Sequence, residues 1–327
     1  MGHCVMKVLI TGAAGFIGSH LTEFLVEAGH DVVAFDRYNS DGTFGWLDTS
    51  HVKSDVNKVF GDIRDQDSVF GAMAGCDRVF HLAALIGIPY SYVSPQAYVQ
   101  TNILGTLNVL QSAKNLGVER VINTSTSETY GSAQFVPMAE NHPKVGQSPY
   151  SASKIAADAL AESFKLSFGM DIRTVRPFNT YGPRQSLRAV VPQIITQCLS
   201  DSTDVSLGDI TTIRDMVFVE DTVNGFWRLS EVDSWQSYDA VNICTGTGLS
   251  IEEIAHKIFK ICDVEKPIVT DTQRLRPQGS EVTKLIGDNK RLKSLVDWSP
   301  TTPIEDGLHR LRDWVLERGT EDLGYRI

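Results

Sequence analysis

The sequence contains few cysteines, and their arrangement gives them no structural pairing. Five cysteines, an odd number, are spread over 327 residues without a single C-x-x-C pair, which argues against a disulfide framework and against a zinc site. No apolar run approaches the roughly 20 residues that span a bilayer, and Met1–Met6 lacks the basic and then apolar pattern of a signal peptide. We therefore expect a cytoplasmic protein with no metal and no membrane association.

Positive charge is also scarce. The 30 lysines and arginines are outnumbered by 40 acidic residues, which gives a net charge of −10, so the chain as a whole does not attract nucleic acid or an anionic membrane. An anionic ligand would have to be held by local arginines. With 42% hydrophobic residues and no repeat or low-complexity tract, the composition is that of one large or two medium globular domains.

Short β-branched apolar runs alternate with helical patterns through the first half of the chain. This alternation predicts the βαβ units of a doubly wound parallel sheet. The expected strands are Lys7–Ile10, Asp31–Phe35, Lys58–Phe60, Arg78–Leu82, Arg120–Asn123 and Ile172–Arg176, and the expected helices are Phe16–Glu27, Gln96–Leu116 and Ser151–Phe168.

After Pro177 the pattern becomes less regular, and glycine and proline mark a change of role. The elements expected there are a helix from about Val190, a strand at Val205–Gly208, a helix at 220–229, a strand at 239–244, and a helix at 250–261 that begins with a capping box. We expect 220–229 and 239–244 to rejoin the sheet. The prediction is an α/β fold with a Rossmann domain, 6–177 plus about 215–246, and a smaller interleaved substrate domain, 178–214 and 247–327.

The first expected strand runs into a glycine-rich turn. Gly12, Gly15 and Gly18 have the spacing G-x-x-G-x-x-G and precede the first helix. In such a turn the first glycine permits the bend, the second lets the backbone approach a pyrophosphate, and the third lets helix and strand pack closely. The helix N-terminus then faces the negative charge. The motif predicts a dinucleotide site that also includes Ala14, Phe16 and Ile17.

Acidic positions after the next two strands predict how the cofactor is held. Asp36 ends the second strand, where a carboxylate can bind both ribose hydroxyls of adenosine and repel a 2′-phosphate, which favours NAD over NADP. Arg37 follows directly and can attract that phosphate, so NADP stays open as an alternative. Asp62 and Ile63 follow the third strand and are expected to reach the adenine, although Asp62 equally suits the N-cap of a helix.

Tyr150 and Lys154 are four residues apart and therefore share one face of an expected helix. A lysine ammonium beside a phenol, together with an oxidised nicotinamide, lowers the phenol pKa toward working pH. Tyr150 can then accept a hydroxyl proton while a hydride leaves the same carbon. With the dinucleotide motif on the same chain, this pair predicts catalysis of alcohol oxidation.

Several motifs together resemble the extended short-chain dehydrogenase/reductase family. Besides the glycine turn and Tyr150-x-x-x-Lys154, they are His81-Leu-Ala-Ala84, Asn102, Ser125-Thr126-Ser127-Glu128-x-Tyr130-Gly131 and Arg176-Pro-Phe-Asn-x-Tyr-Gly-Pro183. The resemblance covers essentially the whole chain and implies an NAD-dependent nucleotide-sugar epimerase, dehydratase or decarboxylase. It also implies that Leu82, Ala83, Ala84 and Asn102 border the cofactor.

By this resemblance, Thr126 hydrogen-bonds the sugar O4 beside Tyr150. Ser127 and Glu128 occupy positions where hexose 4,6-dehydratases carry an Asp-Glu pair and 4-epimerases carry small or apolar residues. Once C4 is a ketone, the C5 proton becomes acidic, and Glu128 can remove it as water leaves C6. The retained glutamate predicts a 4,6-dehydratase in which Ser127 or Glu128 relays a proton to the leaving hydroxyl.

The segments around Tyr150 and Arg176 most resemble the UDP-N-acetylglucosamine 4,6-dehydratases that retain configuration at C5. UDP-sugar 4-epimerases, UDP-glucuronate decarboxylases and 5,6-dehydratases remain alternatives, as does a non-catalytic NAD-binding regulator. A decarboxylase would need a cation for the C6 carboxylate, for which Arg184 or Arg188 is available. By family position, the expected UDP-sugar contacts are Arg214 and Arg276 on the diphosphate, Asn179 on the phosphates or sugar, and Val205 and Leu207 on the uracil.

The resemblance also implies a homodimer. Gln96–Leu116 and Ser151–Phe168 occupy the positions where this family pairs subunits through a four-helix bundle. Both carry apolar residues beyond one narrow stripe, as a helix buried on two sides does. The residues concerned include Leu104, Leu107, Leu160 and Phe164.

Overall fold

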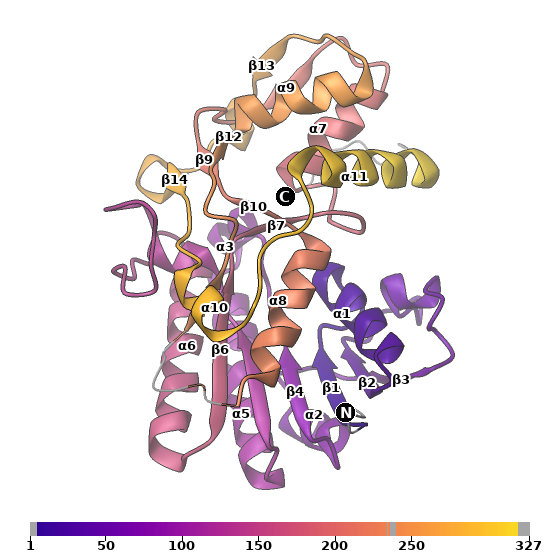
Figure 1. The fold of residues 1–327 in the computed structure, drawn as a ribbon, viewed down its shortest axis with the longest axis vertical. Helices are drawn as coiled ribbons and strands as arrows, with labels where there is room; N and C mark the ends of the chain where they lie inside the picture. The colour runs from indigo at the N-terminus through magenta and orange to yellow at the C-terminus, as the bar shows by residue number, and fades with distance from the viewer. Residues whose placement is uncertain (1–4, 234, 236–239, 320–327) are drawn as a thin grey trace.

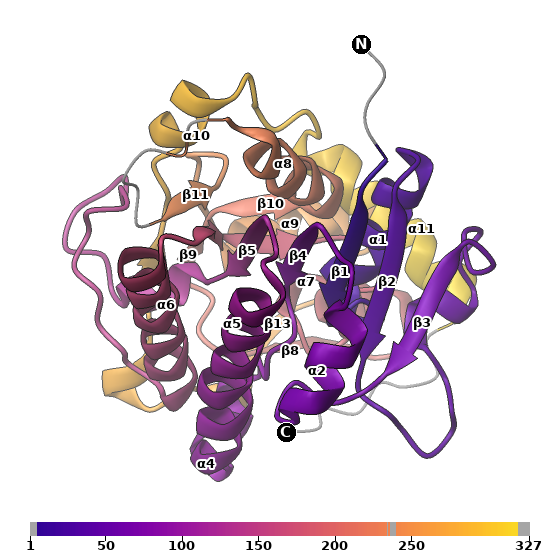
Figure 2. The same ribbon diagram turned by 90° about the horizontal axis from the view of Figure 1, so that it is seen from below.

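The computed structural model describes residues 5–233, 235 and 240–319. Its centre is a seven-stranded sheet, in the order β11-β6-β5-β4-β1-β2-β3, in which every neighbouring pair is parallel. The strands are β1 (Lys7–Thr11), β2 (Asp31–Asp36), β3 (Val56–Phe60), β4 (Arg78–His81), β5 (Arg120–Thr124), β6 (Asp171–Pro177) and β11 (Val241–Ile243). Helices cover both faces of this sheet (Figures 1 and 2). The predicted Rossmann-type α/β fold is therefore confirmed.

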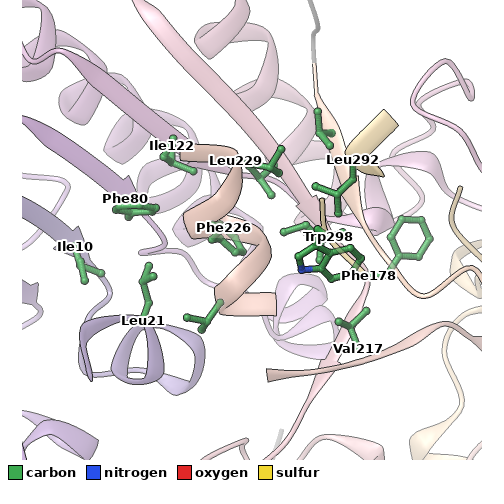
Figure 3. Packing of buried hydrophobic residues seen from close by; sticks show 14 of the residues in the cluster. Ile10, Leu21, Phe80, Ile122, Phe178, Val217, Phe226, Leu229, Leu292 and Trp298 are labelled. Carbon is green, nitrogen blue, oxygen red and sulfur yellow. The ribbon is translucent and has the colours of Figure 1, made fainter. Parts of the chain in front are cut away.

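Both faces of the sheet are buried, which explains why its strands read as continuous apolar runs. Along β1, Val8 and Ile10 belong to one hydrophobic cluster and Leu9 belongs to another. The first cluster lies under α1 (Phe16–Glu27) and α8 (Val219–Glu231) and includes Leu21, Phe80, Ile122, Phe226 and Leu229 (Figure 3). The second lies under α2 (Gln66–Met73), α5 (Gly105–Leu116) and α6 (Pro149–Phe168).

The helix expected over Gln96–Leu116 is continuous but consists of three segments with two different windings, α and π. It comprises α4 (Pro95–Tyr98), a π-helical segment (Val99–Leu104) and α5. A Cβ at Gly105 would lie 2.6 Å from the Ile63 side chain, so the glycine lets this helix approach the loop after β3. Helices α2 and α3 (Ile88–Val93) were not predicted, because both are short and weakly periodic.

The second half of the chain adds a smaller unit at one end of the sheet, at the top of Figure 1. Its helices α7 (Val190–Leu199), α9 (Ile251–Cys262) and α11 (Ile304–Arg318) enclose a hydrophobic cluster of their own. The predicted capping box is present, since Ser250 and Glu253 bond each other's backbone. No helix in the described part of the chain is both long and apolar enough to cross a bilayer.

The smaller unit also contains several short strands. They are β7 (Asn179–Tyr181), β8 (Val205–Leu207), β9 (Ile213–Arg214), β10 (Met216–Phe218), β12 (Leu249–Ser250), β13 (Ile268–Thr270) and β14 (Lys284–Leu285). The short helix α10 (Lys290–Leu295) lies instead beside the main sheet, where its Leu292 joins the cluster under α8 (Figure 1). The prediction that the chain returns to the main sheet is confirmed, because β11 pairs with β6. Asp239, where that strand was expected to begin, lies outside the described residues.

Candidate active site

The glycine turn joins β1 to α1. Gly12 has φ +74°, and a Cβ on it would lie 2.9 Å from the Ala83 nitrogen. A Cβ on Gly18 would lie 2.1 Å from the Gly12 oxygen, so the fold itself requires these two glycines. Gly15 differs, because its Cβ would meet only that oxygen, at 3.3 Å. The glycine at this position therefore mainly leaves space above the turn.

The N-terminus of α1 lies beside this space and has no side-chain cap among the described residues. Its N-cap is Gly15, which offers no side-chain hydrogen bond, and the first turn of α1 contains no acidic residue. The first N–H groups of a helix have no intrahelical partner and favour an anion. The predicted residues Ala14, Phe16 and Ile17 all lie at this junction, which fits the pyrophosphate of a dinucleotide.

Asp36 lies at the carboxyl end of β2, and its carboxylate braces the glycine turn. Oδ2 accepts a hydrogen bond from the Ala14 backbone at 2.8 Å, and Oδ1 accepts one from the Arg37 backbone at 2.7 Å. Burial raises the pKa of Asp36, and these two N–H donors oppose that rise. Each carboxylate oxygen keeps a second lone pair, so Asp36 can still accept further hydrogen bonds while its position is fixed.

Asp62 lies in the loop after β3 and is bound by a neighbouring arginine. Arg64 Nε is 3.0 Å from both carboxylate oxygens, and this pairing lowers the pKa of Asp62. The N-cap of α2 is Asp65, which accepts two backbone N–H groups of that helix, so the N-cap alternative for Asp62 is wrong. The Ile63 side chain is buried in the cluster under α5, which leaves only its backbone for an adenine.

Tyr150 and Lys154 lie one turn apart near the start of α6. Their side chains are 7% and 4% exposed, and the Lys154 ammonium donates to the Thr124 carbonyl at 2.6 Å. Burial raises the pKa of Tyr150, against the effect of a hydrogen bond with Thr126. Burial also lowers the pKa of Lys154. A buried phenol with a raised pKa can act as a base at working pH only where positive charge lies close to it.

A buried ion pair beneath these residues was not predicted. Asp158 lies one further turn along α6, and its Oδ2 is 2.9 Å from Arg176 Nη2 and 2.7 Å from the Ser125 hydroxyl. The negative charge of Asp158 opposes the lowering of the Lys154 pKa by burial. The sequence signal was the repeated spacing of four residues from Tyr150 to Lys154 to Asp158.

Asn102 lies in the π-helical segment Val99–Leu104. Its amide nitrogen donates to the Leu85 carbonyl and to the Ser153 hydroxyl, both at 2.9 Å, and its oxygen accepts from the Leu85 backbone at 2.8 Å. Ser153 in turn donates to the Tyr150 carbonyl at 2.7 Å. Because both amide hydrogens are used inside the protein, Asn102 fixes the loop after β4 and the start of α6 and donates to no cofactor.

Thr126, Ser127 and Glu128 form the beginning of a 3-10 turn, η3 (Ser127–Tyr130), directly after β5. The Thr126 hydroxyl accepts a hydrogen bond from the Glu128 backbone at 3.2 Å, which caps this turn. The Glu128 carboxylate is 12% exposed, and its Oε1 is 3.8 Å from Arg276 Nη1. The structure therefore brings Thr126 to Tyr150 and Glu128 to one of the two predicted diphosphate arginines.

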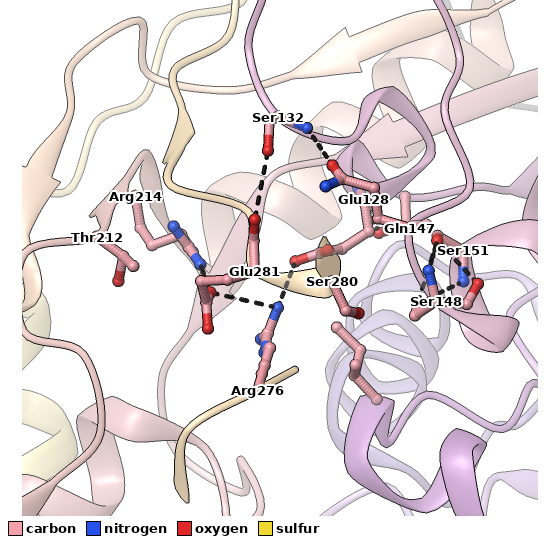
Figure 4. Close-up of polar contacts among 12 residues, drawn as sticks. Glu128, Ser132, Gln147, Ser148, Ser151, Thr212, Arg214, Arg276, Ser280 and Glu281 are labelled. Carbon is pink, nitrogen blue, oxygen red and sulfur yellow. Dashed lines mark hydrogen bonds and ion pairs between the residues drawn. The ribbon is translucent and has the colours of Figure 1, made fainter. Parts of the chain in front are cut away.

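The two arginines meet at a glutamate that the sequence did not single out (Figure 4). Glu281 Oε1 is 3.5 Å from Arg214 Nη2 and 3.9 Å from Arg276 Nη1, longer than a direct charge-assisted hydrogen bond. Arg276 Nη1 and Asn179 Oδ1 are both buried without a hydrogen-bond partner among the described residues. Buried polar atoms are normally paired, so these two atoms are available to a polar ligand.

The structure places three predicted substrate residues elsewhere. Val205 and Leu207 are 0% and 2% exposed, because residues two apart on a strand share a face and this face of β8 lies in the cluster under α7 and α9. The uracil contact predicted for them is therefore wrong. Arg184 donates to both carboxylate oxygens of Glu23 on α1 and is not turned to a sugar carboxylate, whereas Arg188 is exposed.

The sequence matches the GDP-mannose 4,6 dehydratase family over residues 9–311. A dTDP-glucose 4,6-dehydratase of Streptomyces antibioticus is 37% identical over 225 residues, which cover 66% of this chain and 66% of that protein. That alignment therefore spans about two thirds of the relative's length.

Solved structures are similar over almost the whole chain. The dTDP-glucose 4,6-dehydratase DesIV from Streptomyces venezuelae, with NAD bound, has a TM-score of 0.85 at 27% identity and covers 95% of this chain and 97% of its own. A UDP-glucuronic acid 4-epimerase mutant from Bacillus cereus, also with NAD, has a TM-score of 0.88 at 28% identity, over 96% and 100%. The glycine turn and Asp36 are consistent with the NAD that these two structures contain. The chain belongs to the extended short-chain dehydrogenase/reductase family of NAD-dependent enzymes that modify nucleotide sugars, either as dehydratases or as epimerases.

Proposed function

We propose that the protein is an NAD-dependent nucleotide-sugar 4,6-dehydratase that converts UDP-N-acetylglucosamine to a UDP-linked 4-keto-6-deoxy-N-acetylhexosamine. The observation that carries this proposal is the Glu128 carboxylate on the turn capped by Thr126, next to Arg276. Elimination of water across C5 and C6 needs a base for the C5 proton. Epimerisation at C4 needs none, and an epimerase has no use for a carboxylate here.

Bound NAD supplies the hydride acceptor for C4 and the hydride donor for C6. Tyr150 accepts the O4 proton, oriented by the Thr126 hydroxyl, while Lys154 supplies positive charge near the phenolate. Glu128 then removes the C5 proton, which the C4 ketone has made acidic. Ser127 or Glu128 gives a proton to the C6 hydroxyl as it leaves as water. Arg214 and Arg276 hold the diphosphate, and Asn179 contacts the phosphates or the sugar.

Incubation of the NAD-loaded protein with UDP-N-acetylglucosamine, followed by mass spectrometry, tests this proposal. Loss of one water from the sugar supports dehydration, whereas a new sugar isomer of unchanged mass supports the 4-epimerase, which the similarity to the Bacillus cereus enzyme makes the second candidate. Parallel reactions with dTDP-glucose and GDP-mannose identify the nucleotide. Loss of carbon dioxide from UDP-glucuronate would instead identify a decarboxylase.

Replacement of Asp36 tests the cofactor preference. The unmodified protein is expected to bind NAD much more tightly than NADP, since the Asp36 carboxylate repels a 2′-phosphate. In Asp36→Ala the NAD affinity is expected to fall about tenfold, which is the usual cost of losing hydrogen bonds to a charged group. Calorimetric titration with both cofactors measures the difference between the NAD and NADP affinities. Asp36→Asn is the control that keeps an acceptor for Ala14, and equal affinities in the unmodified protein would contradict the assignment.

We also propose a homodimer formed through the outer faces of α5 and α6. Leu104, which ends the π-helical segment just before α5, is 48% exposed, and Leu166 and Phe168 at the end of α6 are 74% and 50% exposed. Phe164, by contrast, is 7% exposed and packs in the core, so its predicted place in the interface is wrong. Leu107 and Leu160 are partly buried against the same core.

Light scattering at micromolar concentration measures the assembly. The expected mass is twice the 36.0 kDa of one chain. Leu104→Lys is expected to shift the protein toward monomers, because it places a charge in an apolar contact. Leu316→Lys is the matched control on α11, where a leucine is 55% exposed away from these helices. A mass of one chain for the unmodified protein would rule out the dimer.

A further inference from the structure

Arg184 connects two segments that are distant in the sequence. Its Nη2 is 2.7 Å from Glu23 Oε1, its Nη1 is 3.0 Å from Glu23 Oε2, and Nη1 also donates to the Ser19 hydroxyl at 3.2 Å. Ser19 and Glu23 belong to α1, whose N-terminus closes the glycine turn. The Arg184 and Glu23 side chains are 19% and 11% exposed, so solvent screens this bidentate pair much less than a surface pair.

The backbone at Arg184 is held in a conformation that is unfavourable for any residue with a Cβ. Its φ is +70°, and Asp263 is the only other non-glycine residue with positive φ in the described part of the chain. The adjacent Gln185 closes the turn by donating its backbone N–H to Gly182 at 3.2 Å. Strained residues of this kind persist where surrounding contacts fix them. Here those contacts are the three hydrogen bonds to α1.

Further contacts join the same loop to the cofactor helix. His20 Nε2 is 3.1 Å from the Pro183 oxygen, and the first two residues of α1 pack against the hydrophobic cluster of the smaller unit. Glu23 Oε1 also accepts the Ser50 hydroxyl at 2.6 Å. The Glu23 carboxylate therefore links α1, the segment after β2 and the loop that contains Arg184.

This loop leads directly to the proposed nucleotide-sugar contacts. It follows β7, whose first residue, Asn179, has the unpaired Oδ1. The Asn179 backbone donates to the Asp215 carbonyl at 3.1 Å, and Asp215 follows Arg214 directly in the chain. A chain of contacts thus runs from α1 through Arg184 to the strands that hold Asn179 and Arg214.

We propose that Arg184 is a positioning residue that couples the NAD-binding helix to the nucleotide-sugar site. Bound NAD then strengthens nucleotide binding, and by linkage a bound nucleotide strengthens NAD binding by the same factor. The inference rests on the proposed function only in taking Asn179 and Arg214 as nucleotide-sugar contacts. It gives Arg184 no contact with the substrate and no step of the reaction.

Calorimetric binding of UDP to NAD-loaded and NAD-stripped protein tests the coupling, with dTDP and GDP as parallel probes. The ratio of the two dissociation constants is the coupling factor, and we expect about five or more in the unmodified protein, within the usual range of coupled sites. Arg184→Met keeps the aliphatic stem and should bring the factor to about one. Arg310→Met is the matched control, because it breaks an exposed bidentate pair with Glu220 on α8 and should leave the factor unchanged.

Glu23→Gln and the double variant with Arg184→Met complete a double-mutant cycle. If the Arg184–Glu23 ion pair carries the coupling, each single variant abolishes the coupling and the double variant has no further effect. A folded Arg184→Met protein that keeps the unmodified coupling factor would overturn the proposal, as would a factor of about one in the unmodified protein. If Arg184→Met does not fold, Glu23→Gln decides the question in the same measurement.

The coupling is measured with UDP, which carries no sugar, so this measurement does not depend on whether the protein dehydrates a sugar. Coupling that disappears in Arg184→Met, in a protein that removes no water from UDP-N-acetylglucosamine, supports the inference and rejects only the dehydratase. Normal dehydration together with an unchanged coupling factor in Arg184→Met rejects only the inference.

Discussion

Replacing Tyr150 with phenylalanine is expected to lower turnover by about a thousandfold or more, because the O4 proton then has no acceptor. The phenol is buried, hydrogen-bonded to Thr126, and lies one helical turn from Lys154, so no other described group stands in its place. Both reduction of the nicotinamide, measured by its absorbance, and loss of water, measured by mass spectrometry, should disappear together. NAD content should be retained, since the Tyr150→Phe change keeps the aromatic ring.

The matched control for this change is Tyr98→Phe. The Tyr98 ring is 6.2 Å from the Tyr150 ring, centroid to centroid, and its hydroxyl bonds the Gly87 carbonyl. The Tyr98→Phe variant loses one neutral hydrogen bond and should keep a turnover within about tenfold of the unmodified protein. Reduction of the nicotinamide by Tyr150→Phe at near-normal rate would show that another group accepts the O4 proton.

Glu128→Gln is expected to separate the two halves of the reaction. Glutamine keeps the shape of the side chain but cannot accept the C5 proton, so dehydration should fall by more than about a hundredfold, the usual size of general-base effects. Oxidation at C4 needs only Tyr150 and should continue. Substrate addition should therefore produce reduced nicotinamide without loss of water, and solvent deuterium should not enter C5.

Glu281→Gln provides the comparison for Glu128→Gln. Glu281 lies at a similar distance from Arg276 Nη1, 3.9 Å against 3.8 Å for Glu128, so both variants remove one negative charge beside the same guanidinium. Only Glu128 is proposed as the base, so Glu281→Gln should change substrate affinity and still dehydrate at saturating substrate. Dehydration by Glu128→Gln at near-normal rate would make Glu128 a bystander and would show that another group removes the C5 proton.

The parts of the site that sequence patterns predicted are local ones. The glycine turn and the Tyr150–Lys154 pair each depend on spacing within a few residues, which a strand-to-helix turn or a helical face determines directly. Local patterns do not predict whether a given face of a short strand is turned to the core or to a ligand. Val205 and Leu207 are apolar whether β8 turns them to a ligand or to the core, and only the packing of α7 and α9 decides between the two.

Contacts between distant segments were also beyond sequence reasoning. Arg184 was predicted to be available for the C6 carboxylate that a decarboxylase would bind, but its partner in the structure is Glu23, 161 positions away. Glu281 shows no local motif, and its role depends on Arg214 and Arg276 meeting in space. The π-helical winding around Asn102 was read as regular helix, since its apolar pattern fits both windings.

Asp36 limits how cofactor preference can be redesigned. The usual route to an NADP-dependent variant removes the acidic residue and relies on a neighbouring cation, for which Arg37 is already in place. In this protein, however, the same carboxylate holds the Ala14 backbone N–H, so a small apolar replacement leaves a donor unpaired at the pyrophosphate turn. Directed evolution toward NADP should therefore first select substitutions that restore a hydrogen-bond acceptor at that N–H, before those that favour the phosphate.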